Sequence, residues 1–292
     1  MRIGGKVAVV TGGASGIGRA LALAFAEQGA EGVVVADIDA GGAASVAAEI
    51  TGRGGLALSA GTDVTDEDQV RALAEQAEEA FGRIDVFCSN AGIIVAGGVE
   101  VPDAAWEQIW AVNVQSHIYA ARAVLPGMLA RNEGYLVITA SAAGLLTQLG
   151  SAPYAVTKHA AVALAEWLAI THADSGLKVA CLCPQAVTTN LGATSQRETG
   201  ASAGIAAPAD APPAATGAVP SSDAGSVSRQ AAVDGVLTPE QVAASVIDAL
   251  DGERFLILPH PEVATYERRR AEDRDRWLGG MRRLHARLAG KG

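Results

Sequence analysis

The sequence predicts a single α/β domain, residues 1–292, built on a doubly wound parallel sheet with helices on both faces. Short apolar runs alternate with helix-forming segments along the chain, as in sheets made of strand–helix–strand units. Hydrophobic residues make up 49% of the chain and aromatic residues only 4%, which suits a close-packed sheet of small apolar side chains. A glycine-rich turn joins the first apolar run to the first helix-forming segment.

The expected strands are short apolar runs that end in polar or small residues. They cover residues 6–10, 33–36, 56–62, 84–89, 135–140, 178–183 and 255–258. The segments between them carry helix formers and apolar residues at helical spacing. The expected helices cover residues 19–29, 43–50, 66–81, 102–128, 155–169 and 238–250. The last of these begins with Thr-Pro-Glu-Gln, a capping box with proline at the first helical position.

The turn after the first strand, residues 11–18, reads T-G-G-A-S-G-I-G. Between a strand and a helix, such a turn is typical of dinucleotide binding, although its glycines follow the less common spacing G-x-x-x-G-x-G. Gly12 permits the tight turn, Gly16 lets the backbone approach a pyrophosphate, and Gly18 allows close packing of helix on strand. The helix N-terminus then presents N–H groups to the phosphates. The expected cofactor-binding residues here are Gly12, Ser15, Gly16, Ile17 and Gly18.

Three further cofactor contacts are expected where later strands end. Asp37 follows the second strand, where a carboxylate accepts hydrogen bonds from both ribose hydroxyls and repels a 2′-phosphate, which favours NAD over NADP. The alternative is a solvated acid at a strand end, since Asp39 follows closely. Asp63–Val64 is placed to contact the adenine, and Asn90–Ala91–Gly92 offers backbone that can lie against a flat ligand.

Residues 141–158 carry the expected catalytic chemistry. Tyr154 and Lys158 are four residues apart on a predicted helix, so both side chains face the same space. An ammonium near a phenol favours the phenolate and lowers its pKa from about 10. Ser141 follows the fifth strand and can donate to the substrate oxygen. A Tyr-x-x-x-Lys pair alone is a weak signal, and the other motifs give it weight.

Two polar residues lie within the predicted helix 102–128. Asn113 interrupts an apolar face, and a buried amide requires hydrogen-bond partners. It is either a helix-packing amide or part of the site. His117 lies one turn later and is expected to serve packing or an interface.

The composition excludes several kinds of partner. A net charge of −10 argues against nucleic acid and anionic membranes, and no apolar run is long enough to span a bilayer. The chain starts directly with a strand and shows no signal-peptide pattern. Its three cysteines make neither a disulfide framework nor, without nearby partner ligands, a metal site. A cytoplasmic enzyme without metal is therefore expected.

Two segments depart from the strand–helix alternation. Residues 192–235 are rich in Ala, Pro, Ser and Gly, too poor in large apolar groups to order strongly. We expect a substrate lid there, with a plain linker as the alternative. Residues 262–288 form an Arg-rich helical extension with interleaved acids, either a solvated surface or a subunit contact.

Together these motifs resemble the short-chain dehydrogenase/reductase family over nearly the whole chain. Its T-G-x-x-x-G-x-G pattern matches residues 11–18, its N-A-G matches residues 90–92, and its Y-x-x-x-K matches residues 154–158. The resemblance implies a Rossmann fold and a catalytic set in which Tyr154 is the general acid/base. Lys158 would lower the phenol pKa and bind the nicotinamide ribose, Ser141 would hold the substrate oxygen, and Asn113 would position a relay water.

The turn after the sixth strand departs from the family pattern. Pro184–Gln185 stands where the family usually has Pro-Gly, so the backbone beside the nicotinamide is expected to differ. Pro184, Val187 and Thr189 still match positions that the resemblance places against the cofactor.

The expected activity is therefore NAD-dependent interconversion of a secondary alcohol and a ketone. Apolar residues near the site suggest a hydrophobic substrate: Ile93, Ile94, Leu145, Leu146 and Leu149. The alternatives are a 3-oxoacyl thioester reductase, which Asp37 opposes because such enzymes usually prefer NADP, and a non-catalytic NAD-binding sensor or scaffold. The helix of Tyr154 is apolar over more of its surface than one sheet contact needs, so a homodimer or homotetramer is expected.

Overall fold

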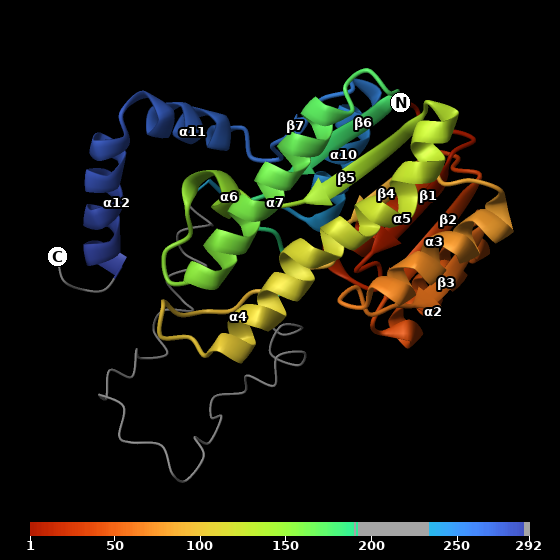
Figure 1. Ribbon diagram of the computed structural model, residues 1–292, viewed down its shortest axis with the longest axis horizontal. Helices are drawn as coiled ribbons and strands as arrows, with labels where there is room; N and C mark the ends of the chain where they lie inside the picture. Colours follow the sequence, from red (N-terminus) through yellow and green to blue (C-terminus); the bar gives the residue numbers. More distant parts are fainter. Residues whose placement is uncertain (190, 192–233, 289–292) are drawn as a thin grey trace, which may run out of the picture.

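The computed structural model describes residues 1–189, 191 and 234–288. Within them, seven parallel strands form one sheet in the order β3-β2-β1-β4-β5-β6-β7 (Figure 1). The strands are β1 Val7–Thr11, β2 Gly32–Asp37, β3 Ala57–Gly61, β4 Val86–Ser89, β5 Gly134–Thr139, β6 Leu177–Leu182 and β7 Leu256–Ile257. The predicted Rossmann-like α/β architecture is confirmed, and the strand boundaries move by one to two residues, which is the usual uncertainty at element ends.

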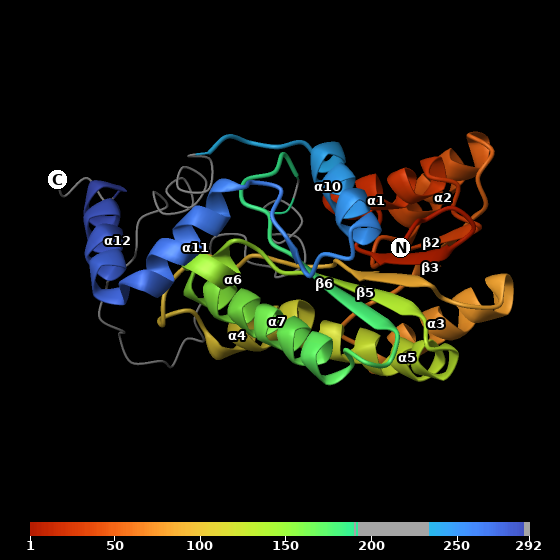
Figure 2. The same ribbon diagram turned by 90° about the horizontal axis from the view of Figure 1, so that it is seen from above.

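Two helical layers cover the sheet (Figure 2). One layer holds α1 (Gly16–Glu27), α2 (Ala40–Gly52) and α10 (Pro239–Asp251). The opposite layer holds α3 (Glu67–Phe81), α5 (Ser116–Arg131) and α7 (Ala152–Thr171), with α4 (Asp103–Trp110) beside them. At one end, α6 (Ala143–Leu146), α11 (Glu262–Glu272) and α12 (Arg274–Leu288) extend the structure, and α12 projects from the main body (Figure 1).

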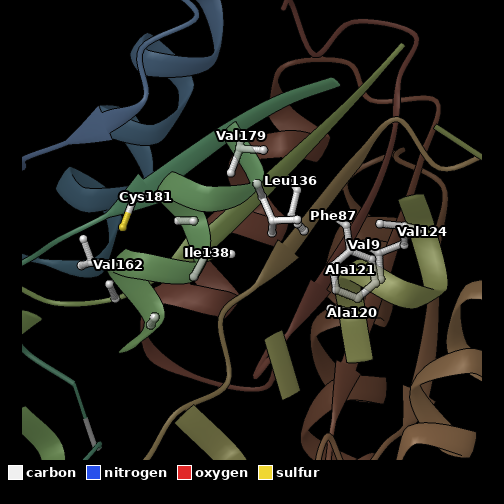
Figure 3. Packing of buried hydrophobic residues seen from close by; sticks show 14 of the residues in the cluster. Val9, Phe87, Ala120, Ala121, Val124, Leu136, Ile138, Val162, Val179 and Cys181 are labelled. Carbon is white, nitrogen blue, oxygen red and sulfur yellow. The ribbon is translucent and has the colours of Figure 1, made fainter. Parts of the chain in front are cut away.

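Alternate residues of each central strand enter opposite halves of the core. In β5, Leu136 and Ile138 pack towards α5 and α7, whereas Tyr135 and Val137 pack towards the layer of α1 and α10. Figure 3 shows the first half, in which Phe87 lies close to α5. Because both faces are buried, the strands read as continuous apolar runs and not as an alternation.

Three features differ from the sequence prediction. The predicted helix 102–128 is interrupted by a π-helical turn, Ala111–Gln115, a feature often found at functional sites. The four-residue helix α6 was not predicted, because it has no capping signal. The tail is two helices: Asp273 has extended backbone after α11, and its carboxylate accepts from the Arg276 N–H at 2.9 Å, which caps the start of α12.

Three further sequence predictions concern a membrane-spanning segment, a metal site and the substrate lid. No described helix is long and apolar enough to cross a membrane, and no cluster of metal-binding side chains occurs in the described part of the chain. The expected lid, residues 192–235, lies outside the described residues except for its last two.

Candidate active site

The candidate site lies at the edge of the sheet where the carboxyl ends of the strands meet. The strand order reverses between β1 and β4, and ligands of open α/β sheets bind at such a switch point. The glycine-rich turn follows β1 and residues 90–92 follow β4, on the two sides of this point. The chain therefore brings the predicted cofactor turn and the predicted catalytic segment to one edge.

The glycine-rich turn leaves no room for side chains. Gly12 has φ +64° and Gly16 has φ +52°, in the left-handed region that favours glycine. A Cβ on Gly12 would lie 2.9 Å from the Ala91 Cα, and one on Gly16 would lie 3.2 Å from the Thr189 Cγ2. The turn, residues 90–92 and Thr189 thus lie close together. We call this group of residues the cradle; its glycine turn and helix N-terminus are of the kind that binds phosphates.

Helix α1 points its N-terminus at this cradle. Ser15 is the N-cap residue, and its exposed side chain makes no capping hydrogen bond. Its hydroxyl and the first N–H groups of the helix can therefore bind an anion. Ile17, on the first turn, packs its side chain against the core on the α1 side of the sheet.

The two acids after β2 have different partners. Asp37 accepts from the Ala14 N–H and the Asp39 N–H, each at 3.0 Å, so its carboxylate is fixed against the glycine-rich turn. Asp39 instead caps α2 by accepting from the Gly42 N–H at 2.9 Å. This geometry favours Asp37 over the alternative of a solvated strand-end acid, because it holds the carboxylate beside the cradle.

The predicted adenine contacts lie after β3. The Asp63 carboxylate accepts from the Thr65 N–H at 2.9 Å and from its hydroxyl at 2.7 Å, which fixes the loop. Val64 is buried in a small apolar cluster that also contains Ile93 and Tyr154. This loop therefore joins the predicted cofactor side of the site to the predicted catalytic side.

Asn90 holds three strands together. Its backbone N–H donates to the Thr11 hydroxyl at 2.9 Å, and its side-chain NH2 donates to the Thr11 carbonyl at 3.0 Å. Its side-chain oxygen accepts from the Thr139 hydroxyl at 3.1 Å. These bonds join β1, β4 and β5 at the sheet edge.

Ser141, Tyr154 and Lys158 converge behind the cradle. Tyr154 and Lys158 lie on one face of α7 and are only 9% and 3% exposed. The Lys158 Nζ lies 5.8 Å from the centre of the Tyr154 ring and donates to the Thr139 carbonyl at 2.8 Å. Ser141 follows β5, and its hydroxyl donates to the Pro184 carbonyl at 3.3 Å and accepts from the Ala143 N–H at 3.1 Å.

The electrostatics of this group differ from the sequence expectation. Burial raises the pKa of Tyr154, and the hydrogen bond with Ser141 lowers it by less. Burial also lowers the pKa of Lys158, to about 8. We predicted that Lys158 lowers the pKa of the Tyr154 phenol, but in the protein without bound cofactor the pKa of Tyr154 is raised. The ammonium lies near the ring and bonds to a carbonyl, while desolvation of both groups favours their neutral forms.

The side-chain amide of Asn113 forms hydrogen bonds with Ile93 and Thr157. Its side-chain oxygen accepts from the Ile93 N–H at 2.9 Å, and its NH2 donates to the Ile93 carbonyl at 2.9 Å and to the Thr157 hydroxyl at 3.3 Å. The side chain thus acts as the packing amide that the sequence left open. It fixes the loop after β4 against α7. The role of Asn113 in positioning a relay water stays a prediction.

His117 lies one turn beyond Asn113 and is completely buried. Its Nδ1 is 2.7 Å from the Ser89 hydroxyl, and burial, followed by the charge of Lys158, lowers its pKa to about 3. The predicted packing role is supported. An interface role is excluded for a side chain with no exposed surface.

The turn after β6 is held from two sides. The Pro184 carbonyl accepts from the Ala142 N–H at 2.9 Å as well as from Ser141. The Gln185 N–H donates to the His260 Nδ1 at 3.3 Å. Further along, Val187 pairs with Leu237 in an isolated parallel bridge. Two residues later, the Thr189 side chain lies beside Gly16 of the glycine-rich turn.

Sequence reasoning missed Thr139, Thr157 and His260. The first two act through a carbonyl and a hydroxyl that only the folded chain brings to Lys158 and Asn113. The sequence did contain a signal for His260. This residue follows the last predicted strand, and each of the other predicted strands was followed by a predicted site residue. Of the apolar residues expected to face a substrate, Ile93, Leu145 and Leu146 are buried in the core, whereas Ile94 and Leu149 are half-buried.

Comparisons with known proteins agree with this geometry. The family described as short chain dehydrogenase matches residues 6–204. The 1-deoxy-11-beta-hydroxypentalenate dehydrogenase of Streptomyces exfoliatus is 40% identical over 71% of this chain and 77% of its own length. The 3beta-hydroxysteroid dehydrogenase 2 of Eggerthella lenta is 34% identical over 65% of this chain and 74% of its own.

Among solved structures, a short chain dehydrogenase/reductase from Burkholderia phymatum in complex with NAD is similar along most of the chain. It is 34% identical, with a TM-score of 0.81 over 94% of this chain and 96% of that one. The chain LigD from Sphingobium sp. strain SYK-6 is 22% identical with a TM-score of 0.72. At that identity the likeness concerns the fold alone.

Proposed function

Because this chain belongs to the short-chain dehydrogenase family, whose members similar to it include several dehydrogenases of hydroxyl compounds, we propose that it transfers a hydride between NAD(H) and a secondary alcohol or ketone. The observation that carries the proposal is the convergence of Ser141, Tyr154 and Lys158 at the sheet edge that also holds the glycine cradle. Bound NAD would supply the hydride acceptor, and NADH the hydride donor.

Tyr154 moves the proton in this proposal. When an alcohol is oxidised, the phenolate takes the hydroxyl proton, and bound NAD would accept the hydride from the carbinol carbon. When a ketone is reduced, the phenol returns that proton to the carbonyl oxygen. Burial raises the phenol pKa, so Tyr154 is protonated at neutral pH and ready to act as an acid. We therefore expect oxidation to speed up as the pH rises and reduction to slow down.

Ser141 and Lys158 support this transfer. The Ser141 hydroxyl lies close to Tyr154, whose pKa it lowers, and it can turn to donate to the substrate oxygen. Lys158 is fixed by the Thr139 carbonyl under the Tyr154 ring. From there its ammonium can donate to the hydroxyls of a bound nicotinamide ribose, a contact that would favour its charged form.

The cradle fits NAD on the evidence of its shape and charge. Side chains are excluded at Gly12 and Gly16, and Asp37 is held beside the turn by two N–H groups. The remaining lone pairs of its carboxylate can accept from ribose hydroxyls, whereas a 2′-phosphate would meet its negative charge. The similar Burkholderia structure, which is in complex with NAD, supports this choice.

Cofactor preference is expected to depend on Asp37. The wild type should have a kcat/KM for NAD at least about tenfold above that for NADP, a difference of about 1.4 kcal/mol. Asp37→Ser should narrow the ratio by weakening NAD and admitting NADP. Asp39→Ala is the matched control: it removes the cap of α2, which costs about 1 kcal/mol of stability, and should leave the ratio unchanged. Equal values for both cofactors in the wild type would contradict the assignment.

We propose a hydrophobic alcohol or ketone as the substrate. Ile94 is half-buried and packs against the apolar cluster that contains Tyr154. The dehydrogenases named above carry the names of a hydroxypentalenate and a hydroxysteroid. A screen of secondary alcohols and ketones of increasing apolar size, followed by NADH absorbance, tests the proposal. Turnover of 3-oxoacyl thioesters with NADPH alone would favour the reductase alternative. NAD binding without turnover of any compound would favour a sensor or scaffold.

We further propose a homodimer or homotetramer located in the cytoplasm. In α7, Trp167 is 58% exposed and Ile170 is 78% exposed, and Trp110 of α4 is also exposed; exposed large apolar side chains are candidates for a subunit interface. The three cysteines are buried and unpaired, which suits a reducing compartment. We expect light scattering at micromolar concentration to give the mass of two or four chains. Trp167→Arg should lower it, whereas a monomeric wild type would contradict the prediction.

A further inference from the structure

His260 occupies an unusual position for a polar side chain. It follows β7 at the sheet edge of the site and is only 2% exposed. Its Nδ1 accepts from the Gln185 N–H at 3.3 Å, and its Nε2 is buried with no hydrogen-bond partner in the described part of the chain. A ring nitrogen that accepts from an N–H is unprotonated, so the ring is neutral with its proton on Nε2.

The bond to His260 fixes a turn that also touches the catalytic group. Immediately before Gln185, the Pro184 carbonyl accepts from the Ser141 hydroxyl at 3.3 Å and from the Ala142 N–H at 2.9 Å. The turn is therefore held on one side by Ser141 and Ala142, which follow β5, and on the other side by His260. If the His260 bond is lost, the Pro184 carbonyl and with it Ser141 lose half of this support.

The polar groups that face His260 come from residues 234–235 and from α11. Burial lowers the pKa of its imidazole, and the Gly235 carbonyl and the charges of Glu262 and Asp234 raise it by less. The contribution of Gly235 comes from its backbone carbonyl, which interacts with the imidazole. Asp234 is itself fixed, because its carboxylate accepts from the Tyr266 hydroxyl of α11 at 2.8 Å. Protonation therefore requires a pH below the usual histidine range, near 6.5.

We propose that neutral His260 is a positioning residue for catalysis, and that protonation of its Nδ1 releases the Pro184–Gln185 turn and lowers activity in acid. This inference rests on the proposed dehydrogenase function. An imidazolium presents two N–H donors and cannot accept from the Gln185 N–H. The two facing donors would repel each other, and the turn would move away from Ser141. The Gln185 side chain plays no part in this contact, which uses the backbone N–H.

Two substitutions distinguish the loss of the hydrogen-bond acceptor at position 260 from the loss of its titrating imidazole. In His260→Asn, the side-chain oxygen can take the place of Nδ1 and does not titrate. In His260→Leu, no acceptor remains. The test uses ketone reduction, because Tyr154 stays protonated, the form that reduction needs, throughout acid pH. In that direction we expect wild-type kcat to fall as the pH drops below the usual histidine range, and His260→Asn to lose this acid fall while keeping kcat at pH 7 within about threefold. His260→Leu should lose about tenfold or more in kcat at every pH.

The control and the second readout do not depend on turnover. His285 is exposed on α12, so His285→Leu should leave the pH profile unchanged. In protein labelled with 15N-histidine, the His260 Nδ1 should show the shift of an unprotonated acceptor at pH 7 and should titrate in acid. Thermal unfolding and NAD affinity by calorimetry verify that each variant is folded and binds the cofactor.

The outcomes distinguish this inference from the proposed function. If the wild type reduces ketones and both His260 variants keep its kcat and its acid fall in that direction, the inference is wrong. A protonated His260 Nδ1 at pH 7 would also overturn it, even with no substrate known. If the wild type binds no NAD and oxidises no alcohol, the proposed function fails, and the 15N titration alone still decides whether His260 accepts from the turn.

Discussion

Replacing Tyr154 by Phe is expected to abolish turnover while leaving the fold and NAD affinity close to those of the wild type. The Tyr154 ring is buried among Val64, Ile93 and Ile109, and a phenylalanine keeps all of these contacts. Only the hydroxyl and its hydrogen bond with Ser141 are lost. A positioned general acid or base contributes about 10² to 10⁴-fold, and no other phenol in this cluster is placed to replace it.

Tyr119 provides the matched control, because it is half-buried beside the same apolar cluster. Tyr119→Phe removes a hydroxyl from the same neighbourhood and should keep kcat within about twofold of the wild type, since surface-side changes of this kind are small. Steady-state kcat and calorimetric NAD affinity are measured for both variants. A Tyr154→Phe variant with near-normal kcat would remove Tyr154 from the proton transfer and with it the proposed mechanism.

The motifs that the sequence revealed are those with local causes. The glycine-rich turn is read from residues 11–18 because each glycine serves a backbone conformation or a close approach within one strand–turn–helix unit. Tyr154 and Lys158 are read together because four residues make one helical turn. The parallel sheet follows from the alternation of strands and helices. These predictions need only the chain on either side of each motif.

The parts that sequence reasoning missed depend on distant residues. Gln185 and His260 are 75 positions apart, and no pattern in the chain pairs them. The direction of the Tyr154 pKa depends on desolvation by the whole cluster, and the sequence shows the neighbouring charge but not the burial. The catalytic role of Asn113, which the family resemblance implies, stays a prediction, and its three hydrogen bonds to Ile93 and Thr157 exist only once the loop after β4 meets α7.

Gly18→Ala is expected to have the second large effect, on both cofactor affinity and stability. A Cβ on Gly18 would lie 2.0 Å from the Gly12 carbonyl oxygen and 2.7 Å from the Asn90 side-chain nitrogen. No flexible side-chain end can relieve the first clash, so the turn or α1 must move. Asn90 joins β1, β4 and β5, and its displacement would spread the strain along the sheet edge.

The size of the effect can be bounded by two other glycines. We expect Gly18→Ala to lower the free energy of unfolding by about 1–3 kcal/mol or more and NAD affinity by about tenfold or more. A Cβ on Gly16 would meet only the Thr189 side chain, at 3.2 Å, although φ is +52°, so Gly16→Ala should be milder for stability and still weaken NAD. Gly52 ends α2 with nothing within 4 Å, and Gly52→Ala should stabilise the chain by up to about 1 kcal/mol.

Urea unfolding and NAD calorimetry on the three alanine variants test these expected stabilities and affinities. The same added methyl group is expected to destabilise the protein where the backbone is crowded and to stabilise it where the backbone is open. The stability ranking Gly52→Ala, wild type, Gly16→Ala, Gly18→Ala, from most to least stable, follows from the clash distances and backbone angles. NAD affinity should fall only in the two turn variants. If Gly18→Ala were as stable as the wild type and bound NAD equally well, the close approach of α1 to the turn would not be what shapes the cradle.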